Sequence, residues 1–122
     1  MSQTTSFENI REMFAAFDRN DIPALTTYVT DDVRLQLMNT DPVHGQPAFA
    51  AAVSAFHKSV AGIRHEILDL WSDGEVVIAE LSVHYLRLDG HAVTLPCCNV
   101  FRLQDGRIAD YRSYMDPTPV YA

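Results

Sequence analysis

Three Asp-Gly pairs restrict the possible folds of this chain more than any other feature of the sequence. They follow one another at a constant step of 16 residues, each after a run rich in β-branched, aromatic and leucine residues: Asp73-Gly74, Asp89-Gly90 and Asp105-Gly106. Asp-Gly supplies the positive backbone dihedral angles that tight hairpin turns need. Residues 75–121 are therefore predicted to form a long antiparallel meander, with the earlier part of the chain packed on one of its faces.

The runs between these pairs are long for β-strands. Fourteen residues lie between successive pairs, and at about 3.3 Å per residue such a run spans roughly 40 Å, about twice an ordinary strand. Strands of this length must bend sharply in a small domain. Pro96 cannot donate a hydrogen bond to a neighbouring strand, so it predicts a bulge or an edge position in its run. A strongly curved sheet with a concave face is expected.

Three amphipathic helices are predicted ahead of these strands. The first starts near Thr5, which has capping-box spacing to Glu8, and ends near Asp18. Asp21 can cap a short second helix, and residues 48–60 have the apolar spacing of a third. The apolar stripe of the first helix contains Phe7, Ile10, Phe14 and Phe17.

Strands and loops occupy the intervals between the helices. Alternating apolar residues predict strands at 33–38 and 63–71, whereas residues 30–32 and the proline-containing segment 39–47 are expected to be loops. Together with the meander, these elements predict an α+β fold. It is a half-open cone with the curved antiparallel sheet on one side, the three helices on the other and a pocket between them.

Length and composition fit one domain that covers residues 1–122. With 48% hydrophobic residues the chain can bury a real core, and no apolar run approaches the ~20 residues of a membrane span. The first residues have neither the basic nor the apolar region of a signal peptide, so a cytoplasmic protein is expected. The net charge of −7 repels phosphate backbones, and we expect neither nucleic-acid nor membrane binding.

Several chemistries lack the residue patterns that they need. The five histidines show no close metal-ligand spacing, and the chain has neither a glycine-rich phosphate loop nor a Gly-x-Ser-x-Gly nucleophile elbow. Cys97 and Cys98 are neighbours in a predicted strand, where successive side chains point to opposite faces, so buried reduced thiols are expected rather than a disulfide. We therefore expect no metal and no cofactor.

Three polar residues in the long strands are candidates for chemistry. A carboxylate in an apolar pocket has a raised pKa, and Asp116 is either such an acid or base or an exposed cap at the end of its strand. Asn99 is either a hydrogen-bond donor to a substrate oxygen or a buried amide paired with water or backbone. His84 can pair with Asp116 if its polar strand face lines the cavity, and is a surface residue if the cavity is lined instead by Leu81, Val83 and Tyr85.

The order of the predicted elements and three short segments among the strands are distinctive. A helix, a short helix, a strand, a loop with His44-Gly45, a helix and four long strands follow one another. The segments are Leu-Pro-Cys-Cys-Asn-Val-Phe at 95–101, Asp-Gly-Arg-Ile at 105–108 and Tyr-Arg-Ser-Tyr-Met-Asp at 111–116. Over essentially its whole length the chain resembles the SnoaL-like branch of the NTF2-like, or cystatin-like α+β cone, superfamily. That superfamily hosts ketosteroid isomerases, polyketide cyclases, limonene-type epoxide hydrolases, dehydratases and non-catalytic members, so the resemblance implies a fold more than a function.

The resemblance implies roles for particular residues. Asp116 matches the carboxylate at the end of the last strand that epoxide-hydrolase and polyketide-cyclase relatives use as acid or base. Asn99 matches the position from which ketosteroid isomerases donate a hydrogen bond to the developing enolate. Asp41 lies in an Asp-Pro-Val stretch similar to that around the isomerase base.

The chain departs from the family patterns at two places. The arginine and aspartate of the epoxide hydrolases fall on Ser82 and His84 here, so the cation and the second acid of that reaction are missing. The tyrosine of the isomerase oxyanion hole falls on Phe14 or Phe17, so that hole is incomplete.

We therefore expect a small cofactor-independent enzyme of the SnoaL-like type. It would isomerise, cyclise or dehydrate a small apolar carbonyl-type molecule in the cone cavity. The predicted catalytic residues are Asp116, His84 and Asn99, and the candidate substrate-binding residues are Phe14, Phe17, Cys97, Tyr114 and Asp41. The resemblance also implies a homodimer formed through the convex sheet face. The alternative is a non-catalytic module of the same fold that binds a small ligand or dimerises.

Overall fold

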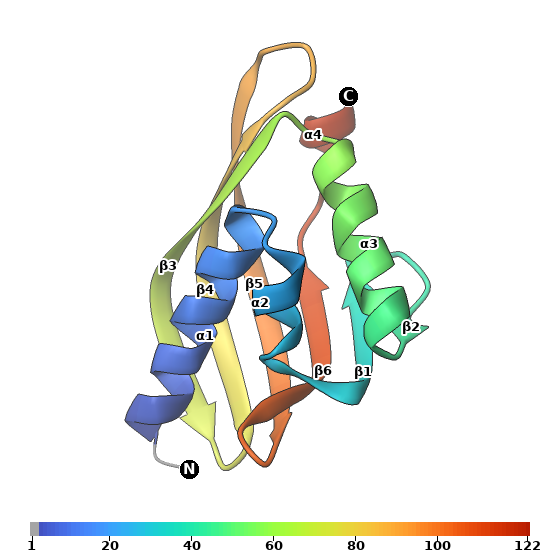
Figure 1. Ribbon diagram of the computed structural model, residues 1–122. Helices are drawn as coiled ribbons and strands as arrows, with labels where there is room; N and C mark the ends of the chain where they lie inside the picture. The colour runs from blue at the N-terminus through green and yellow to red at the C-terminus, as the bar shows by residue number, and fades with distance from the viewer. Residues whose placement is uncertain (1–2) are drawn as a thin grey trace.

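A curved sheet of six strands forms one layer of the molecule, and helices cover its concave face (Figure 1). The computed structural model describes residues 3–122. The strands are Val29–Leu37 (β1), Val43–His44 (β2), Gly62–Asp73 (β3), Val76–Leu86 (β4), Ala92–Gln104 (β5) and Arg107–Tyr114 (β6). They lie side by side in the order β2-β1-β6-β5-β4-β3. The predicted α+β cone with a curved sheet is confirmed.

Tight turns at the three Asp-Gly pairs join β3 to β4, β4 to β5 and β5 to β6, as predicted. The turn glycines all have positive φ angles, of 59° at Gly74, 89° at Gly90 and 81° at Gly106. All three strand pairs are antiparallel. Local turn chemistry therefore accounts for the order β6-β5-β4-β3.

Pro96 lies where β5 has a neighbour on one side only. β5 pairs with β4 from Ala92 onward, but its pairing with β6 begins at Cys98. A proline is tolerated in such a segment because one side of the strand has no ladder to interrupt. The edge alternative is therefore confirmed, and the irregularity in the β5–β6 pairing lies further on, between Arg102 and Leu103.

β1 and β6 run parallel, which corrects the expectation of an entirely antiparallel sheet. Leu35 lies opposite Tyr111, and Leu37 lies opposite Ser113. Four strands and a helix separate β1 from β6 along the chain, so no local turn determines their relative direction.

The segment around β1 contains more strand than the sequence predicted. β1 begins at Val29, so residues 30–32, expected to be a loop, belong to a strand whose register shifts before Arg34. Two residues of the predicted loop 39–47 form β2, which pairs antiparallel with β1 and sets His44 opposite Arg34.

Three helices form the second layer: α1 (Gln3–Asp18), α2 (Ile22–Thr26) and α3 (Gln46–Lys58). Asp21 caps α2 as predicted, because its carboxylate accepts a hydrogen bond from the Ala24 backbone N–H at 3.2 Å. α1 packs against β3 and α3 against β1, so the two long helices stand over opposite halves of the sheet (Figure 1). Within residues 3–122 no helix is long and apolar enough to cross a membrane.

The apolar side chains of the long strands face the helices. Aromatic rings fill the centre, where the Phe101 ring lies 4.8 Å from that of Tyr111 and 5.8 Å from that of Phe14, both edge-on. Burial of one such side chain stabilises the fold by about 1.5–3 kcal/mol, so these positions decide which face of each strand turns inward. In β4 the inward residues, all at most 5% exposed, are Val77, Ala79, Leu81, Val83 and Tyr85.

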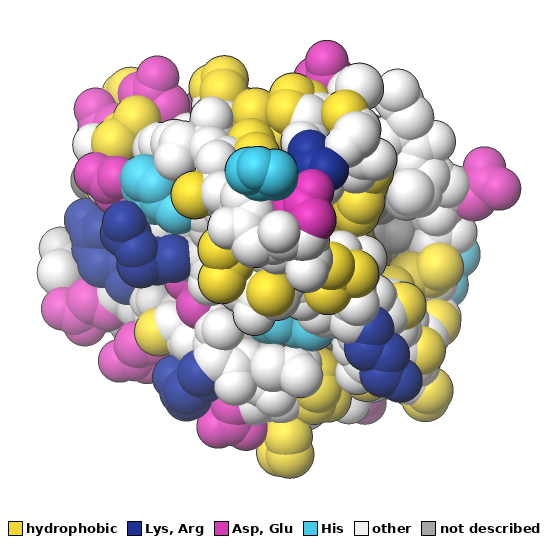
Figure 2. Space-filling model, turned by 90° about the horizontal axis from the view of Figure 1, so that it is seen from above, with side chains coloured by type: hydrophobic (Ala, Val, Ile, Leu, Met, Phe, Trp, Pro, Cys, Tyr) yellow, Lys and Arg dark blue, Asp and Glu magenta, His cyan; other side chains and the backbone are white. Residues whose placement is uncertain are grey.

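A short fourth helix, α4 (Thr118–Tyr121), lies next to the C-terminal end of α3 (Figure 1). Arg87, near the β4–β5 turn, donates a hydrogen bond to the Pro119 carbonyl at 3.1 Å and so ties this turn to α4. Asp89 in the same turn pairs with Arg87 at 2.8 Å and with His91 at 3.2 Å. Seen from above, the surface at this end mixes small groups of hydrophobic side chains with acidic, basic and histidine side chains (Figure 2).

Candidate functional site

Four polar side chains form a hydrogen-bonded chain on the concave face of the sheet. The Cys97 thiol donates to Asn99 Oδ1 at 3.3 Å, and Asn99 Nδ2 donates to the Tyr111 hydroxyl at 3.4 Å. Ser113 Oγ lies 3.4 Å from Cys97 Sγ. Strand register assembles this chain, because Asn99 lies opposite Ser113 in the β5–β6 pair. The sequence placed Asn99 and Cys97 in the interior, and both are buried there.

Burial disfavours the charged forms of Cys97 and Tyr111, the two ionisable side chains of this hydrogen-bonded group. It raises the pKa of the Cys97 thiol and holds the pKa of the Tyr111 hydroxyl well above its usual value of 10.0. Cys97 is a buried free thiol, as expected, whereas Cys98 is partly exposed. Because the Tyr111 hydroxyl accepts its hydrogen bond from Asn99, it keeps its own hydrogen as a donor.

Asp18 and His65 form a second polar group in the interior. Asp18 Oδ1 lies 2.5 Å from His65 Nδ1, and Asp18 Oδ2 accepts a hydrogen bond from the His65 backbone N–H at 2.8 Å. The side chains are 20% and 7% exposed, respectively. Asp18 is the last residue of α1, and His65 lies on the concave face of β3, opposite Val83 of β4. One carboxylate thus holds both the backbone and the ring of the histidine.

This carboxylate selects one tautomer of His65. A carboxylate only accepts hydrogen bonds, so Nδ1 carries the hydrogen and Nε2 is left as the basic nitrogen. Among residues 3–122 the structure gives Nε2 no hydrogen-bond partner. The ring packs against Phe14 and Phe17, with centroids 4.6 Å and 5.2 Å away. The result is an oriented base in apolar surroundings, an arrangement suited to general base catalysis.

The Asp18–His65 pair was not predicted from the sequence, although two features of the sequence point to it. Asp18 carries a negative charge at the C-terminal end of α1, where the helix dipole disfavours it, so a compensating partner is expected. His65 shares a face of β3 with Ile63 and Ile67, which places it on the apolar side of its strand. The two residues are 47 positions apart in sequence, so only the folded chain identifies them as partners.

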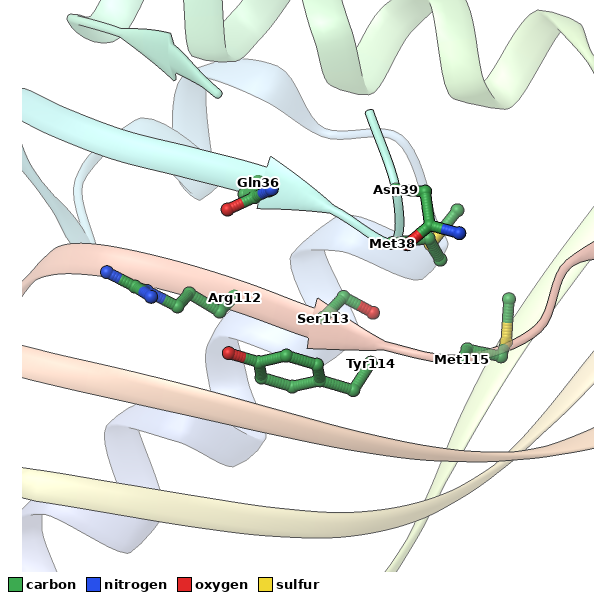
Figure 3. Close-up of a pocket in the computed structure, with 7 residues that line it drawn as sticks. All are labelled: Gln36, Met38, Asn39, Arg112, Ser113, Tyr114 and Met115. Atoms are coloured by element: carbon green, nitrogen blue, oxygen red, sulfur yellow. The ribbon is translucent and has the colours of Figure 1, made fainter. Parts of the chain in front are cut away.

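A pocket of about 230 Å³ lies where β1 and β6 end. Ser113 lines this pocket and also belongs to the hydrogen-bonded group of Cys97, Asn99 and Tyr111, so the pocket lies next to that group. Tyr114, a predicted substrate-binding residue, lies along its wall with the hydroxyl toward the side on which Arg112 lies (Figure 3). The other lining residues are Gln36, Met38, Asn39 and Met115.

Asp116 lies outside the interior, which corrects its prediction as a desolvated acid or base. Its carboxylate is exposed and accepts hydrogen bonds from the Thr118 backbone N–H at 3.0 Å and from Thr118 Oγ1 at 2.7 Å. These bonds lower the pKa of Asp116 from its ordinary value. Asp116 is thus an exposed residue after the end of its strand, as in the alternative interpretation, and its carboxylate accepts hydrogen bonds from the first residue of α4.

His84 lies on the convex face, which corrects its prediction as the partner of Asp116. Its Nε2 lies 2.8 Å from Glu66 Oε1 and its Nδ1 lies 3.0 Å from Thr94 Oγ1. The apolar residues that alternate with His84 occupy the inward positions of β4, and the two-residue period of a strand turns His84 outward.

The remaining predicted residues lie apart from one another. Phe14 and Phe17 are fully buried and contact the His65 ring, so they line the Asp18–His65 pair rather than an open cavity. Asp41 is exposed in the turn between β1 and β2. Within the described part of the chain no three acidic, histidine or cysteine side chains converge in a way that could hold a metal ion.

The curved sheet and the helices on its concave face define an α+β cone, and hydrogen-bonded polar side chains lie between the two layers. The sequence model of the SnoaL-like domain matches residues 10–111 of the chain. The chain therefore belongs to the SnoaL-like domain family. Among curated protein sequences, none matches it.

Solved structures show the same fold at low sequence identity. An NTF2-like protein of unknown function from Burkholderia pseudomallei has a TM-score of 0.90 and 21% identity, with both chains fully covered. TerC, co-crystallised with polyporic acid, has a TM-score of 0.87 and 16% identity over 94% of each chain. An LEH-like epoxide hydrolase from M. tuberculosis has a TM-score of 0.81 and 21% identity over 97% of this chain and 87% of its own. At sequence identities this low, the similarity to these structures shows a shared fold and nothing about activity.

Proposed function

We propose that this protein is a small enzyme that moves a proton on a compact, mostly apolar carbonyl compound inside the cone, without a cofactor. The observation that carries this proposal is the Asp18–His65 pair, with its Nδ1 to Oδ1 distance of 2.5 Å and its setting against the Phe14 and Phe17 rings. Membership in the SnoaL-like family supports small-molecule chemistry in general. The co-crystal of TerC with polyporic acid supports the view that a chain of this fold can hold a small organic compound.

The interior groups divide the reaction between them. His65 Nε2 takes a proton from the carbon next to the carbonyl group, and the Asp18 carboxylate stabilises the imidazolium that results. The electron pair of the broken C–H bond moves onto the carbonyl oxygen. The Tyr111 hydroxyl, oriented by Asn99, donates a hydrogen bond to that oxygen. Return of the proton to another carbon gives an isomer, and loss of hydroxide from the neighbouring carbon gives a dehydrated product.

Solvent deuterium exchange tests this proposal without knowledge of the product. We expect the protein to accelerate exchange of the α-hydrogens of at least one member of a panel of small cyclic ketones, followed by proton NMR. His65→Gln should reduce this rate by about 10²–10⁴-fold, the usual contribution of a positioned general base. It should leave the affinity for the ketone within about twofold.

His84→Gln is the matched control, because it removes an imidazole from the convex face. This variant should catalyse exchange of the ketone α-hydrogens at the same rate as the unmodified protein. Exchange at an undiminished rate in His65→Gln would refute the assignment of His65, and the absence of exchange with every ketone would refute the enzymatic proposal.

The second candidate function is the non-catalytic module, in the form of a homodimer. Phe14, Phe101 and Tyr111 fill the centre of the cone with their own rings, as a binding or assembly module permits. The large hydrophobic side chains exposed on the convex side include Leu68 (55%), Trp71 (48%) and Ile78 (36%). Trp71 lies opposite Ile78 in the β3–β4 pair, so they form a continuous apolar surface that a second copy of the chain could cover.

A further inference from the structure

We propose that the pocket at the ends of β1 and β6 binds the carboxylate group of a small organic acid. This pocket is distinct from the Asp18–His65 pair, and the proposal stands independently of the proton-transfer chemistry above. It rests on the local charge, on the hydrogen-bond donors of the pocket wall, and on the backbone conformation of one wall residue.

Two arginine side chains and the carboxylate of Asp110 form a cluster beside the pocket, in a chain whose overall charge is −7. Arg34 and Arg112 flank the single carboxylate of Asp110. Arg112 Nε lies 2.9 Å and its Nη2 3.3 Å from the Asp110 oxygens, and Arg34 Nη1 lies 3.8 Å from Asp110 Oδ1. Two guanidinium groups share one carboxylate, so the cluster holds one excess positive charge. The nearby Asp116 carboxylate is held by Thr118.

One nitrogen of this cluster makes no hydrogen bond. Arg34 Nη1 is buried, and it has no hydrogen-bond partner among the described residues. Its neighbour Arg34 Nη2 donates to Gln36 Oε1 at 3.1 Å, and Gln36 Nε2 donates to the Thr40 carbonyl at 3.2 Å. The Gln36 amide on the pocket wall is therefore hydrogen-bonded through both its oxygen and its nitrogen, and the Arg34 guanidinium bonded to it keeps one nitrogen without a hydrogen bond.

The wall of the pocket combines donors with two apolar surfaces. Arg112, the Asn39 amide and the Tyr114 hydroxyl supply N–H and O–H groups, while Met38 and Met115 supply thioether side chains (Figure 3). A planar carboxylate suits a guanidinium and neighbouring donors, and polarizable methionine side chains favour an aromatic or short apolar body. The volume of about 230 Å³ is below the roughly 300–1,000 Å³ of sites for drug-sized ligands. A simple aryl carboxylate fits these requirements.

Met38 has an unusual backbone conformation for its residue type. Its φ angle is 50°, a left-handed value that is ordinary for Gly or Asn in a turn but costly for methionine. Its N–H donates to the Ser113 carbonyl at 2.9 Å, which holds the wall residue against the end of β6. Strained residues of this kind concentrate at ligand sites. The strain thus supports a binding role for this turn.

Benzoate and the neutral benzyl alcohol, similar in size, test the proposal by NMR titration of the ¹⁵N-labelled protein. We expect benzoate to shift the resonances of Met38, Asn39 and Tyr114, and benzyl alcohol to bind at least tenfold more weakly. Arg112→Met should weaken benzoate binding at least tenfold. Arg64→Met is the matched control, because it removes the same charge from β3, at the other edge of the sheet, and it should leave binding unchanged.

Three outcomes would overturn the proposal. They are equal binding of the two probes, equal loss of benzoate binding in both arginine variants, and shifts confined to residues outside the pocket. If Arg112→Met does not fold, the double variant Asn39→Ala with Tyr114→Phe takes its place, since both side chains are exposed on the pocket wall. Unchanged benzoate affinity in that variant would equally refute the site. Loss of ketone exchange in His65→Gln has no bearing on these results.

Discussion

Three acidic residues of this protein show how the partner of a carboxylate decides its role. Asp116 is exposed and bonds to Thr118, so its carboxylate stabilises a short helix. Asp18 bonds to a histidine that is almost fully buried, so its carboxylate determines which nitrogen of that ring is basic. Asp110 lies between two guanidinium groups, so its carboxylate fixes their positions beside a pocket.

The stabilisation that Asp116 provides should depend on pH in a defined direction. Hydrogen bonds from Thr118 lower the pKa of Asp116 from 3.8, so this stabilisation is present above that value and is lost as the pH falls through the lowered pKa. We expect Asp116→Asn to unfold at a slightly lower temperature than the unmodified protein at pH 7, and at the same temperature near pH 2. Thermal unfolding of both proteins at the two pH values measures this. A difference that persists near pH 2 would contradict the hydrogen-bond explanation.

The interior residues were predictable from sequence only in part. Alternation within a strand and the family resemblance placed Asn99 and Cys97 inside the cone. The position of each residue depends only on its own strand and the neighbouring strands. Asp116 was misplaced because the chain turns outward into α4 directly after β6, which no strand pattern indicates. The Asp18–His65 pair was missed because it joins a helix end to a strand 47 positions away.

At the scale of elements, the hairpins depend on residues that tolerate positive φ. Gly74 has a φ of 59°, and an added Cβ would meet no atom within 4 Å, so the cost of alanine there is a backbone cost alone. We expect Gly74→Ala to lower the free energy of unfolding by about 1–2 kcal/mol, the cost of the left-handed conformation. Chemical denaturation of the variant measures this value.

Gly62 provides the control for that substitution. Its φ is not in the positive range, and a Cβ there would make an ordinary contact of 3.6 Å with Leu86 Cβ. Gly62→Ala should leave stability unchanged or raise it by up to about 1 kcal/mol, because alanine restricts the unfolded chain. An equal loss of stability in both variants would show that the turn conformation is not the cause.

The elements themselves were largely predictable, and their long-range arrangement was not. The Asp21 cap, apolar periodicity and Asp-Gly pairs act over a few residues, so α1, α2, α3 and the three hairpins followed from the sequence. The predicted start of α1 at Thr5 was wrong, because the helix already includes Gln3. The pairing of β1 with β6 joins segments that four strands and a helix separate along the chain, so no local pattern encodes it. β2 is only two residues long and lies in a proline-containing segment that has the composition of a loop. For these reasons neither the parallel β1–β6 pair nor β2 could be foreseen.

At the scale of the whole molecule, the convex face raises the question of assembly. If a second copy covers Leu68, Trp71 and Ile78, the protein sediments as a dimer. Trp71→Glu should then shift it to the monomer, because a charge in the centre of the contact loses its hydration. Leu88→Glu is the control, since Leu88 is 70% exposed near the β4–β5 turn, away from this surface. A monomeric unmodified protein, or equal dissociation by both substitutions, would refute the dimer at this face.

The parallel pairing of β1 with β6 has a consequence for how the protein is made. Residues 29–37 are synthesised before their main neighbour in the sheet, residues 107–114, and four strands and a helix lie between the two along the chain. Until then only the two residues of β2 can pair with β1, and Val33 and Leu35, which are buried in the finished protein, lack part of their core. Contacts between such distant segments form slowly. The nascent chain thus carries an unfinished strand edge until β6 has been made, the state in which chaperones act and aggregation starts.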